Sequence, residues 1–137
     1  MFYFCGALVH WFSKVQRSIS FSSTEAEMYG AMMAGREIKY LRNLLVELGH
    51  IIGGPTPMYT DNKSCIELSI DPVAFKKTKH ILLAAEGLRD YAAKLTLEMR
   101  YVAGSVNVAD ILTKGQSPAI FAALMAAHDA LVGGPVP

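Results

Sequence analysis

The sequence predicts a mixed α/β fold in which helices pack on a small sheet. Apolar or alternating stretches typical of strands are interleaved with capped, amphipathic stretches typical of helices. One strand–helix–strand succession around Asp61 requires at least one parallel strand pair. The 137 residues are enough for one domain, and 52% hydrophobic against 18% charged residues is a globular composition rather than that of a disordered chain.

Net charge and cysteine content limit which partners and which cellular location we expect for the protein. The net charge of +1 gives no sign of a polyanionic partner, so any nucleic-acid contact must come from local patches. The two cysteines, Cys5 and Cys65, match neither a disulfide framework nor a metal-binding pair. We therefore expect an intracellular location, cytoplasmic or nuclear.

The first strands form a predicted hairpin. Aromatic and β-branched residues fill positions 2–5 and 8–13, and Gly6 and Ala7 separate them as a tight turn. The apolar start has no basic lead and is far shorter than a membrane span of about 20 residues. This segment is therefore predicted to be a strand, and we expect the protein to have no membrane partner. We also expect the natural domain to begin upstream of this strand.

A long helix follows the hairpin. Ser22 with Glu25 and Thr24 with Glu27 form two overlapping capping boxes, which place its start, and Gly49 is the expected C-cap. Apolar residues recur at helical spacing and predict one buried face. They are Ala34, Ile38, Leu41, Leu45 and Leu48, with Met28, Met32 and Met33 expected as core filler.

The second half of the chain continues the alternation of strands and helices. Residues 57–60 form a short strand that ends at Asp61 and Asn62, which suit a turn or a helix N-cap. The pattern then predicts helices over 62–69 and 79–93, the latter with Leu83, Leu88 and Tyr91 among its apolar positions, and a half-buried strand over 95–102.

The C-terminal region is predicted to be helical. A short helix covers 107–114, and Ser117 with Pro118 opens another that runs to about Leu131. Residues 132–137 are rich in glycine and proline and are expected to form a disordered tail. The domain therefore spans residues 1–131.

Three acids stand where an active site at a sheet edge needs them. Glu27 lies in the first turn of the long helix, Asp61 at the carboxyl end of a strand, and Asp110 in the short helix after the last strand. Clustered carboxylates suit hard divalent cations such as Mg²⁺, and two such ions can promote phosphodiester hydrolysis. The pattern is that of a metal-dependent nuclease.

Each acid also has a purely structural interpretation. An acid in a first helical turn is favoured by the helix dipole, which accounts for Glu27 without any function. Asp61 could cap the following helix, and Asp110 could lie on the solvated face of its own. Spacing alone leaves both interpretations open.

Six segments, in order, resemble the RNase H domain of copia-type retrotransposon polyproteins, over roughly residues 4 to 125. They include the strand-end run Tyr-Thr-Asp-Asn-Lys-Ser and the run Ala-Asp-Ile-Leu-Thr-Lys at 109–114. The others begin at Trp11 (Trp-Phe-Ser-Lys-Val-Gln), Ser22 (Ser-Ser-Thr-Glu-Ala-Glu), Leu41 (Leu-Arg-Asn-Leu-Leu-Val-Glu-Leu-Gly) and Lys76 (Lys-Lys-Thr-Lys-His-Ile).

The resemblance implies an RNase H-like mixed sheet with flanking helices, in which four carboxylates bind two Mg²⁺ ions and cleave the RNA strand of an RNA–DNA hybrid during reverse transcription. Glu27, Asp61 and Asp110 match the second, third and fourth of these acids. The first acid, and the central strand that carries it, have no counterpart among the 137 residues. We therefore expect an N-terminally truncated domain with impaired catalysis.

The resemblance also implies partners. Ser23, Thr24, Asn62 and Lys63 flank the acids and are expected to contact the hybrid, whose 2′-hydroxyls distinguish RNA from DNA. The basic run over 76–79 could steer the nucleic-acid backbone, although short charge runs are commonly just solvated loops. The reverse transcriptase region of the same polyprotein is the expected protein partner.

Two alternatives remain open at this point. One is a non-catalytic retroelement remnant that keeps part of the fold and at most binds nucleic acid or protein. The other is an unrelated small α/β domain whose acids are helix caps. Convergence of the acids on one pocket is the feature that separates a nuclease ancestry from the unrelated domain.

Overall fold

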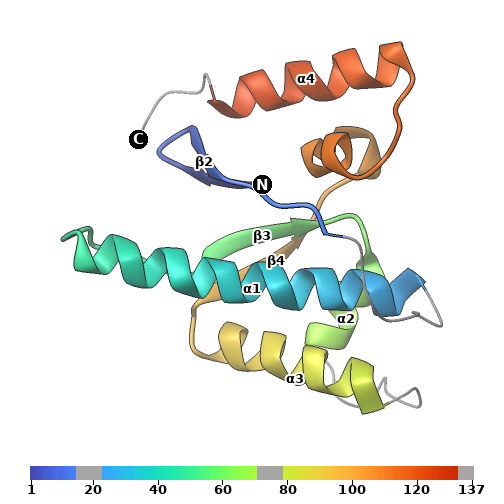
Figure 1. Cartoon of the computed structure of the whole chain (residues 1–137). Helices are drawn as coiled ribbons and strands as arrows, with labels where there is room; N and C mark the ends of the chain where they lie inside the picture. Colours follow the sequence, from blue (N-terminus) through green and yellow to red (C-terminus); the bar gives the residue numbers. More distant parts are fainter. Residues whose placement is uncertain (15–22, 71–78, 133–137) are drawn as a thin grey trace. The chain divides into compact units, whose positions relative to one another are not determined.

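The computed structural model describes residues 1–14, 23–70 and 79–132. By contacts the chain divides into two compact units, Met1–Arg17 with Val102–Pro137, and Ser18–Tyr101. The elements, traced in Figure 1, are β1 (Phe2–Phe4), β2 (Ala7–His10), α1 (Ser23–Glu47), β3 (Thr56–Thr60), α2 (Lys63–Ile70), α3 (Lys79–Ala93), β4 (Leu97–Tyr101), the 3₁₀ helices η2 (Gly104–Val106) and η3 (Val108–Leu112), and α4 (Pro118–Val132).

The strands form two separate two-stranded sheets rather than one mixed sheet. β1 pairs with β2 antiparallel, and β3 pairs with β4 parallel. The mixed α/β class and the parallel pair predicted around Asp61 are thereby confirmed. Among the described residues, no helix has the length and apolar character needed to cross a bilayer.

The N-terminal hairpin turns one residue earlier than the sequence suggested. Phe4 pairs with Ala7, so Cys5 and Gly6 form the loop, with φ of 49° and 75° respectively. Positive φ at both central residues is the signature of the type I′ turn, whose twist matches that of the strands. Ala7 therefore belongs to β2, and this strand ends at His10 rather than at Ser13.

The same unit contains the C-terminal helices. Ser117 caps α4, because its Oγ accepts a hydrogen bond from the Ile120 N–H at 3.5 Å and Pro118 takes the first helical position. The helix contacts η2 and η3 and buries Leu124. It extends to Val132, one residue beyond the predicted end, and the rest of the predicted tail lies outside the described residues.

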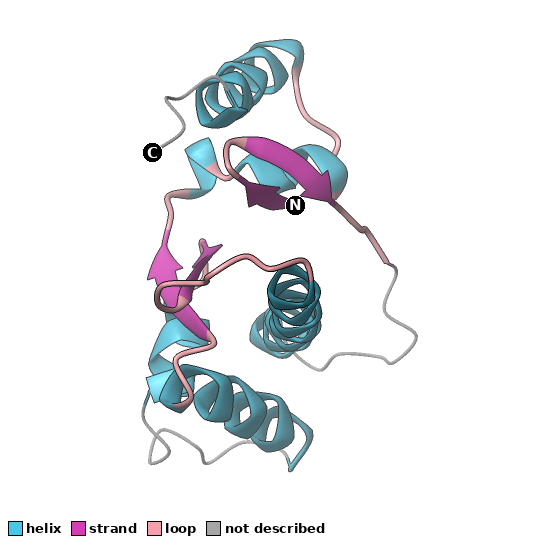
Figure 2. Ribbon diagram, turned by 90° about the vertical axis from the view of Figure 1, so that its left-hand side faces the viewer, coloured by secondary structure: helices cyan, strands magenta, loops and turns pink. Residues whose placement is uncertain are grey.

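The second unit is a parallel strand pair packed with three helices. α1 contacts α3 and β3, α3 contacts β4, and α2 contacts both strands, an arrangement visible in Figure 2. The buried hydrophobic residues of this unit come from all five elements. They are Met28, Ile38, Met58, Cys65, Ile81, Ala84, Ala85, Leu88 and Leu97.

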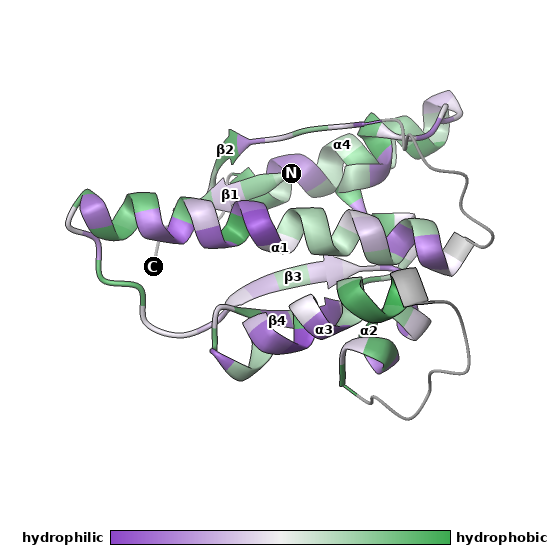
Figure 3. Cartoon of the chain, turned by 60° about the horizontal axis from the view of Figure 1, so that its bottom comes forward, coloured by the Kyte–Doolittle hydropathy of each residue, from purple (hydrophilic) through white to green (hydrophobic). Residues whose placement is uncertain are grey.

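Helix spacing predicted part of this core. Met28, Ile38 and Leu88 are buried as expected, but Leu48 is 66% exposed and Leu83 is 70% exposed. The buried face of α3 is defined by Ile81, Ala84, Ala85 and Leu88, which leaves Leu83 on another side of the helix. Leu48 follows the last residue of α1, and Met33 is also exposed. Figure 3 shows polar and apolar residues interspersed along α1.

A close approach between α1 and its neighbours favours glycine at position 35. A Cβ atom there would lie 3.1 Å from the Tyr91 ring and 3.2 Å from a methyl group of Leu97.

Arg42 of α1 holds the loop that follows this helix. Its Nη1 donates to the Gly54 carbonyl at 2.8 Å and to Thr56 Oγ1 at 2.9 Å. These contacts set the position at which β3 begins.

Two helices end in the same motif with different residues. Gly49 N–H bonds to Val46 O and His50 N–H to Leu45 O, each at 2.9 Å, and Gly49 has φ of +86°. This Schellman motif confirms the predicted C-cap. α3 repeats it with Thr96 N–H donating to Tyr91 O at 2.8 Å, but its left-handed position holds Leu95, with φ of +53°.

Replacing Leu95 by glycine is expected to stabilise the chain. The left-handed conformation costs a residue with a Cβ roughly 1 kcal/mol, and the Leu95 side chain is 63% exposed and so contributes little burial. We expect Leu95→Gly to raise the free energy of unfolding in urea by about 0.5–1 kcal/mol. The control Gly49→Leu should lower it by a similar amount, and a loss of stability in Leu95→Gly would contradict the assignment.

Candidate functional site

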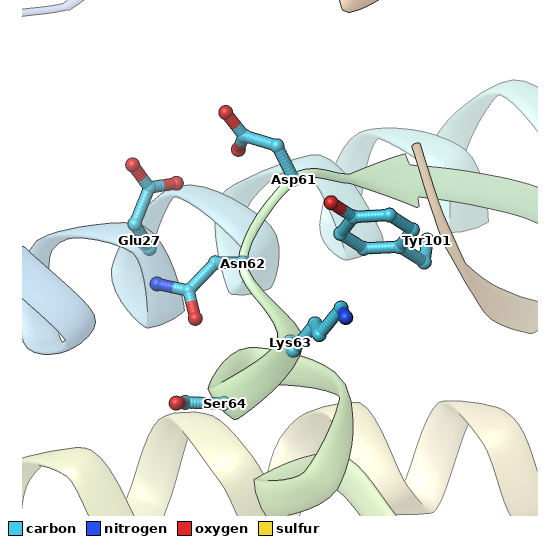
Figure 4. A pocket seen from close by; sticks show the side chains of 6 residues that line it. All are labelled: Glu27, Asp61, Asn62, Lys63, Ser64 and Tyr101. Carbon is cyan, nitrogen blue, oxygen red and sulfur yellow. The ribbon is translucent and has the colours of Figure 1, made fainter. Parts of the chain in front are cut away.

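An open hollow of about 440 Å³ lies in the second unit, where β3 and β4 end. Figure 4 shows the six side chains that line it, and these come from α1, α2, the β3–α2 turn and β4. They are Glu27, Asp61, Asn62, Lys63, Ser64 and Tyr101. Four of the sequence-predicted site residues, Glu27, Asp61, Asn62 and Lys63, are thus together in one place.

Asp61 is placed by the turn from β3 into α2. It follows Thr60, the last residue of β3, and Thr60 Oγ1 accepts a hydrogen bond from the Asn62 N–H at 3.2 Å. Asn62 is the N-cap of α2, because its Oδ1 accepts from the Cys65 N–H at 3.1 Å. The N-cap of α2 is therefore supplied by Asn62.

Glu27 reaches the hollow from the second turn of α1, not from the first turn as predicted, because α1 begins at Ser23 and the acid of its first turn is Glu25. Its side chain is exposed, and Figure 4 shows its carboxylate and that of Asp61 directed toward the same open side. The neighbouring residue Met28 is fully buried, and its Sδ lies 3.7 Å from Cys65 Sγ. This buried sulfur contact joins α1 to α2.

The pKa of the Cys65 thiol is changed by its burial and by the nearby Glu27. Burial, and secondarily the negative charge of Glu27, raise the pKa of Cys65 to about 12. The thiol is therefore protonated at neutral pH and cannot serve as a nucleophile or as a thiolate ligand. The ionisable side chains that line the hollow are those of Glu27, Asp61, Lys63 and Tyr101.

Two residues of the hollow were not predicted, Ser64 and Tyr101. Tyr101 ends β4, pairs in register with Thr60, and is 50% exposed. The Nζ atom of Lys63 lies 5.0 Å from the centre of its ring, within the range of a cation–π interaction. The parallel pairing could have suggested this position, because neighbouring parallel strands end at the same edge of a sheet.

Asp110 lies in the other unit, within η3. Asn107 caps this 3₁₀ helix by accepting from the Ala109 N–H, and Asp110 Oδ2 lies 2.8 Å from Lys114 Nζ. Its carboxylate is 13% exposed and therefore well shielded. Glu27 and Asp61 belong to the second unit, so convergence of Asp110 with them stays a prediction. Within the described part of either unit, no three Asp, Glu, His or Cys side chains gather as a metal site.

The other residues predicted to contact the hybrid are not among the described residues that line the hollow. Ser23 is the first residue of α1, but its side chain lies outside the described part, and Thr24 is half-buried one position later without lining the hollow. The basic run at 76–78 also lies outside the described residues, as does the predicted cap Ser22. These positions stay predictions.

The chain is homologous to retrovirus-related Pol polyproteins of plant transposons. It is 33% identical over 114 residues to that of transposon TNT 1-94 from Nicotiana tabacum, and 33% and 32% identical over 113 residues to those of transposons RE2 and RE1 from Arabidopsis thaliana. The alignments cover 82–83% of this chain but about 8% of each polyprotein. No family model and no solved structure matches.

The two cysteines are expected to differ sharply in reactivity. Cys5 is exposed in the hairpin loop, whereas Cys65 is buried. In native protein at pH 8, a thiol reagent should therefore modify one cysteine quickly, and the second only after denaturation. Two fast-reacting thiols in native protein would contradict the packing of α2 against α1.

The same thiol makes stability depend on pH. Because the folded pKa of about 12 exceeds the ordinary value of 9.0, Cys65 contributes stability below pH 9 that is lost as the pH rises toward 12. We expect the free energy of unfolding to fall by up to about 1.4 kcal/mol per pH unit in that window. In Cys65→Ala this component of the slope should disappear, and an unchanged slope would contradict it.

Proposed function

We propose that this chain is an RNase H-like domain of a copia-type transposon Pol polyprotein, which hydrolyses the RNA strand of RNA–DNA hybrids in a Mg²⁺-dependent reaction. The observation that carries this proposal is the meeting of Glu27 and Asp61 in one open hollow from segments far apart in the sequence. Homology to transposon Pol polyproteins supports it.

The donor atoms of the hollow fit a hard divalent cation. Glu27 and Asp61 supply carboxylate oxygens on the same open side, the ligand type that Mg²⁺ prefers, and the open geometry leaves room for water and a phosphate. Mg²⁺ held there would supply charge stabilisation at the phosphodiester. Asp110 is proposed as a further ligand from η3.

The other residues of the hollow would bind and orient the hybrid. Asn62 uses Oδ1 to cap α2, so its amide N–H₂ group is left to face the hollow as a donor to the sugar-phosphate backbone. Lys63 supplies a positive charge beside the two acids. Ser23 and Thr24, at the start of α1, are proposed as further contacts, and the reverse transcriptase region of the same polyprotein as a partner.

A second candidate is a nucleic-acid-binding module without catalysis. It is favoured by the make-up of the hollow, in which two acids are accompanied by four residues suited to binding rather than bond cleavage, Asn62, Lys63, Ser64 and Tyr101. The two candidates differ in one measurable property, because only the nuclease consumes the RNA strand.

Substituting Asp61 should separate the two candidates. We expect the full chain to cleave a labelled RNA–DNA hybrid in Mg²⁺ only weakly, because the first of the four acids of the RNase H domains it resembles has no counterpart among the 137 residues. Asp61→Asn should lower this weak rate by about 100-fold or more, because a cation ligand is lost. Removal of Mg²⁺ by a chelator should abolish cleavage. The rate is measured by the loss of full-length RNA on a gel.

Asp90→Asn is the matched control. Asp90 is an exposed carboxylate of the same unit, paired with Lys94 at 2.8 Å and remote from the lining of the hollow, so its loss should leave cleavage intact. Equal effects of the two substitutions would contradict the assignment of Asp61. Folded protein that binds the hybrid without cleaving it would support the binding module instead.

A further inference from the structure

Lys63 and Tyr101 form a unit within the hollow. The Lys63 ammonium lies 5.0 Å from the Tyr101 ring centre, and both side chains line the hollow together with Glu27 and Asp61. Figure 4 shows the lysine side chain directed away from Glu27 and toward the tyrosine side of the hollow. The charge of the lysine therefore lies over the tyrosine ring.

Helix stability does not explain a lysine at this position. Lys63 is the first residue of α2, and the first turn of this helix contains no acid. A cation at a helix N-terminus interacts unfavourably with the helix dipole, and only residues near the C-terminus gain from it. The side chain is exposed, so it fills no core either. Its place among the residues that line the hollow makes it a candidate for binding an anionic group.

The two side chains differ in how freely they can move. Tyr101 is the last residue of β4 and pairs with Thr60 in the parallel ladder, which anchors it next to Asp61. Lysine carries its charge on a flexible four-carbon stem that can point in many directions. A ring anchored by the sheet therefore restricts a mobile charge to one side of the two acids.

We propose that Tyr101 is a positioning residue that holds the Lys63 ammonium where it meets a backbone phosphate of the bound hybrid, next to the phosphate that faces the acids. The inference rests on the proposed function. A compact ammonium binds phosphate as a point charge, and phosphate contacts fix the register of a nucleic acid without reading its sequence. The pair would thus align the RNA backbone over Glu27 and Asp61.

A double-mutant cycle tests whether Tyr101 acts through Lys63. Binding of a labelled RNA–DNA hybrid is measured by fluorescence anisotropy in Asp61→Asn protein without Mg²⁺, so that cleavage plays no part. Lys63→Met should weaken binding and lower the slope of log affinity against log salt by about 1. Tyr101→Leu should weaken binding about two- to fivefold, the range of an exposed cation–π contact.

The decisive variant combines both changes. If Tyr101 acts through Lys63, the double variant should bind like Lys63→Met alone. Tyr101→Phe, which keeps the ring, should restore most of the binding that Tyr101→Leu loses. Tyr40→Leu, which removes a 61% exposed tyrosine of α1 away from the hollow, is the matched control and should bind normally.

Three results would overturn the inference. Additive losses in the double variant would mean that Tyr101 contacts the hybrid itself, and a Tyr101→Phe variant as weak as Tyr101→Leu would assign the effect to the hydroxyl. Normal binding by folded Tyr101→Leu would remove the role altogether. Because cleavage is not measured, each result is distinct from a failure of the nuclease proposal, which the Asp61 comparison decides.

Discussion

The parallel pairing of β3 with β4 is the interaction on which the rest of the site depends. Its register sets Thr60 opposite Tyr101, so both strands end at one edge, and the chain turns there into α2. Asn62 closes that turn by capping α2, which leaves the Asp61 side chain at the edge of the hollow. A shift of the pairing by one residue would reverse which faces the alternating side chains occupy and dismantle the arrangement. Two parallel strands form a very small sheet, so the three helices packed around them supply most of its burial.

The ionisable groups in and beside the hollow differ in burial: Glu27 and Lys63 are exposed, whereas Cys65 is buried. Glu27 is exposed and adjacent to Met28, which is fully buried against Cys65, so one helical turn carries both a solvated charge and a core contact. Burial raises the pKa of the Cys65 thiol, and the negative charge of Glu27 raises it further. Lys63 adds the opposite charge, and its exposed side chain places the Nζ atom over the ring of Tyr101. The Cys65 sulfur therefore stays protonated and inert at neutral pH.

Local sequence signals predicted the parts of the fold that local interactions decide. Gly49 ends α1 as expected, because the left-handed C-cap favours glycine, and Ser117 with Pro118 begins α4 as expected. The C-cap of α3 could not be predicted in the same way, because Leu95 adopts this left-handed conformation although it is not glycine. Helical spacing could not tell how far each buried face extends, so Leu48 and Leu83 were wrongly placed in the core. The meeting of Glu27 with Asp61 was predicted from topology and resemblance, but Tyr101 was not, because an exposed tyrosine at a strand end looks ordinary.

The most direct test of the central claim is the location of divalent cation binding. Paramagnetic Mn²⁺, a substitute for Mg²⁺ that also takes oxygen ligands, broadens the NMR amide signals of residues near it. The account predicts that broadening at low Mn²⁺ centres on residues 26–28 and 61–64, and that it is lost from both segments in Glu27→Gln. Broadening that spares these segments, or that persists unchanged in Glu27→Gln, would contradict the assignment of Glu27 and Asp61 to one cation site.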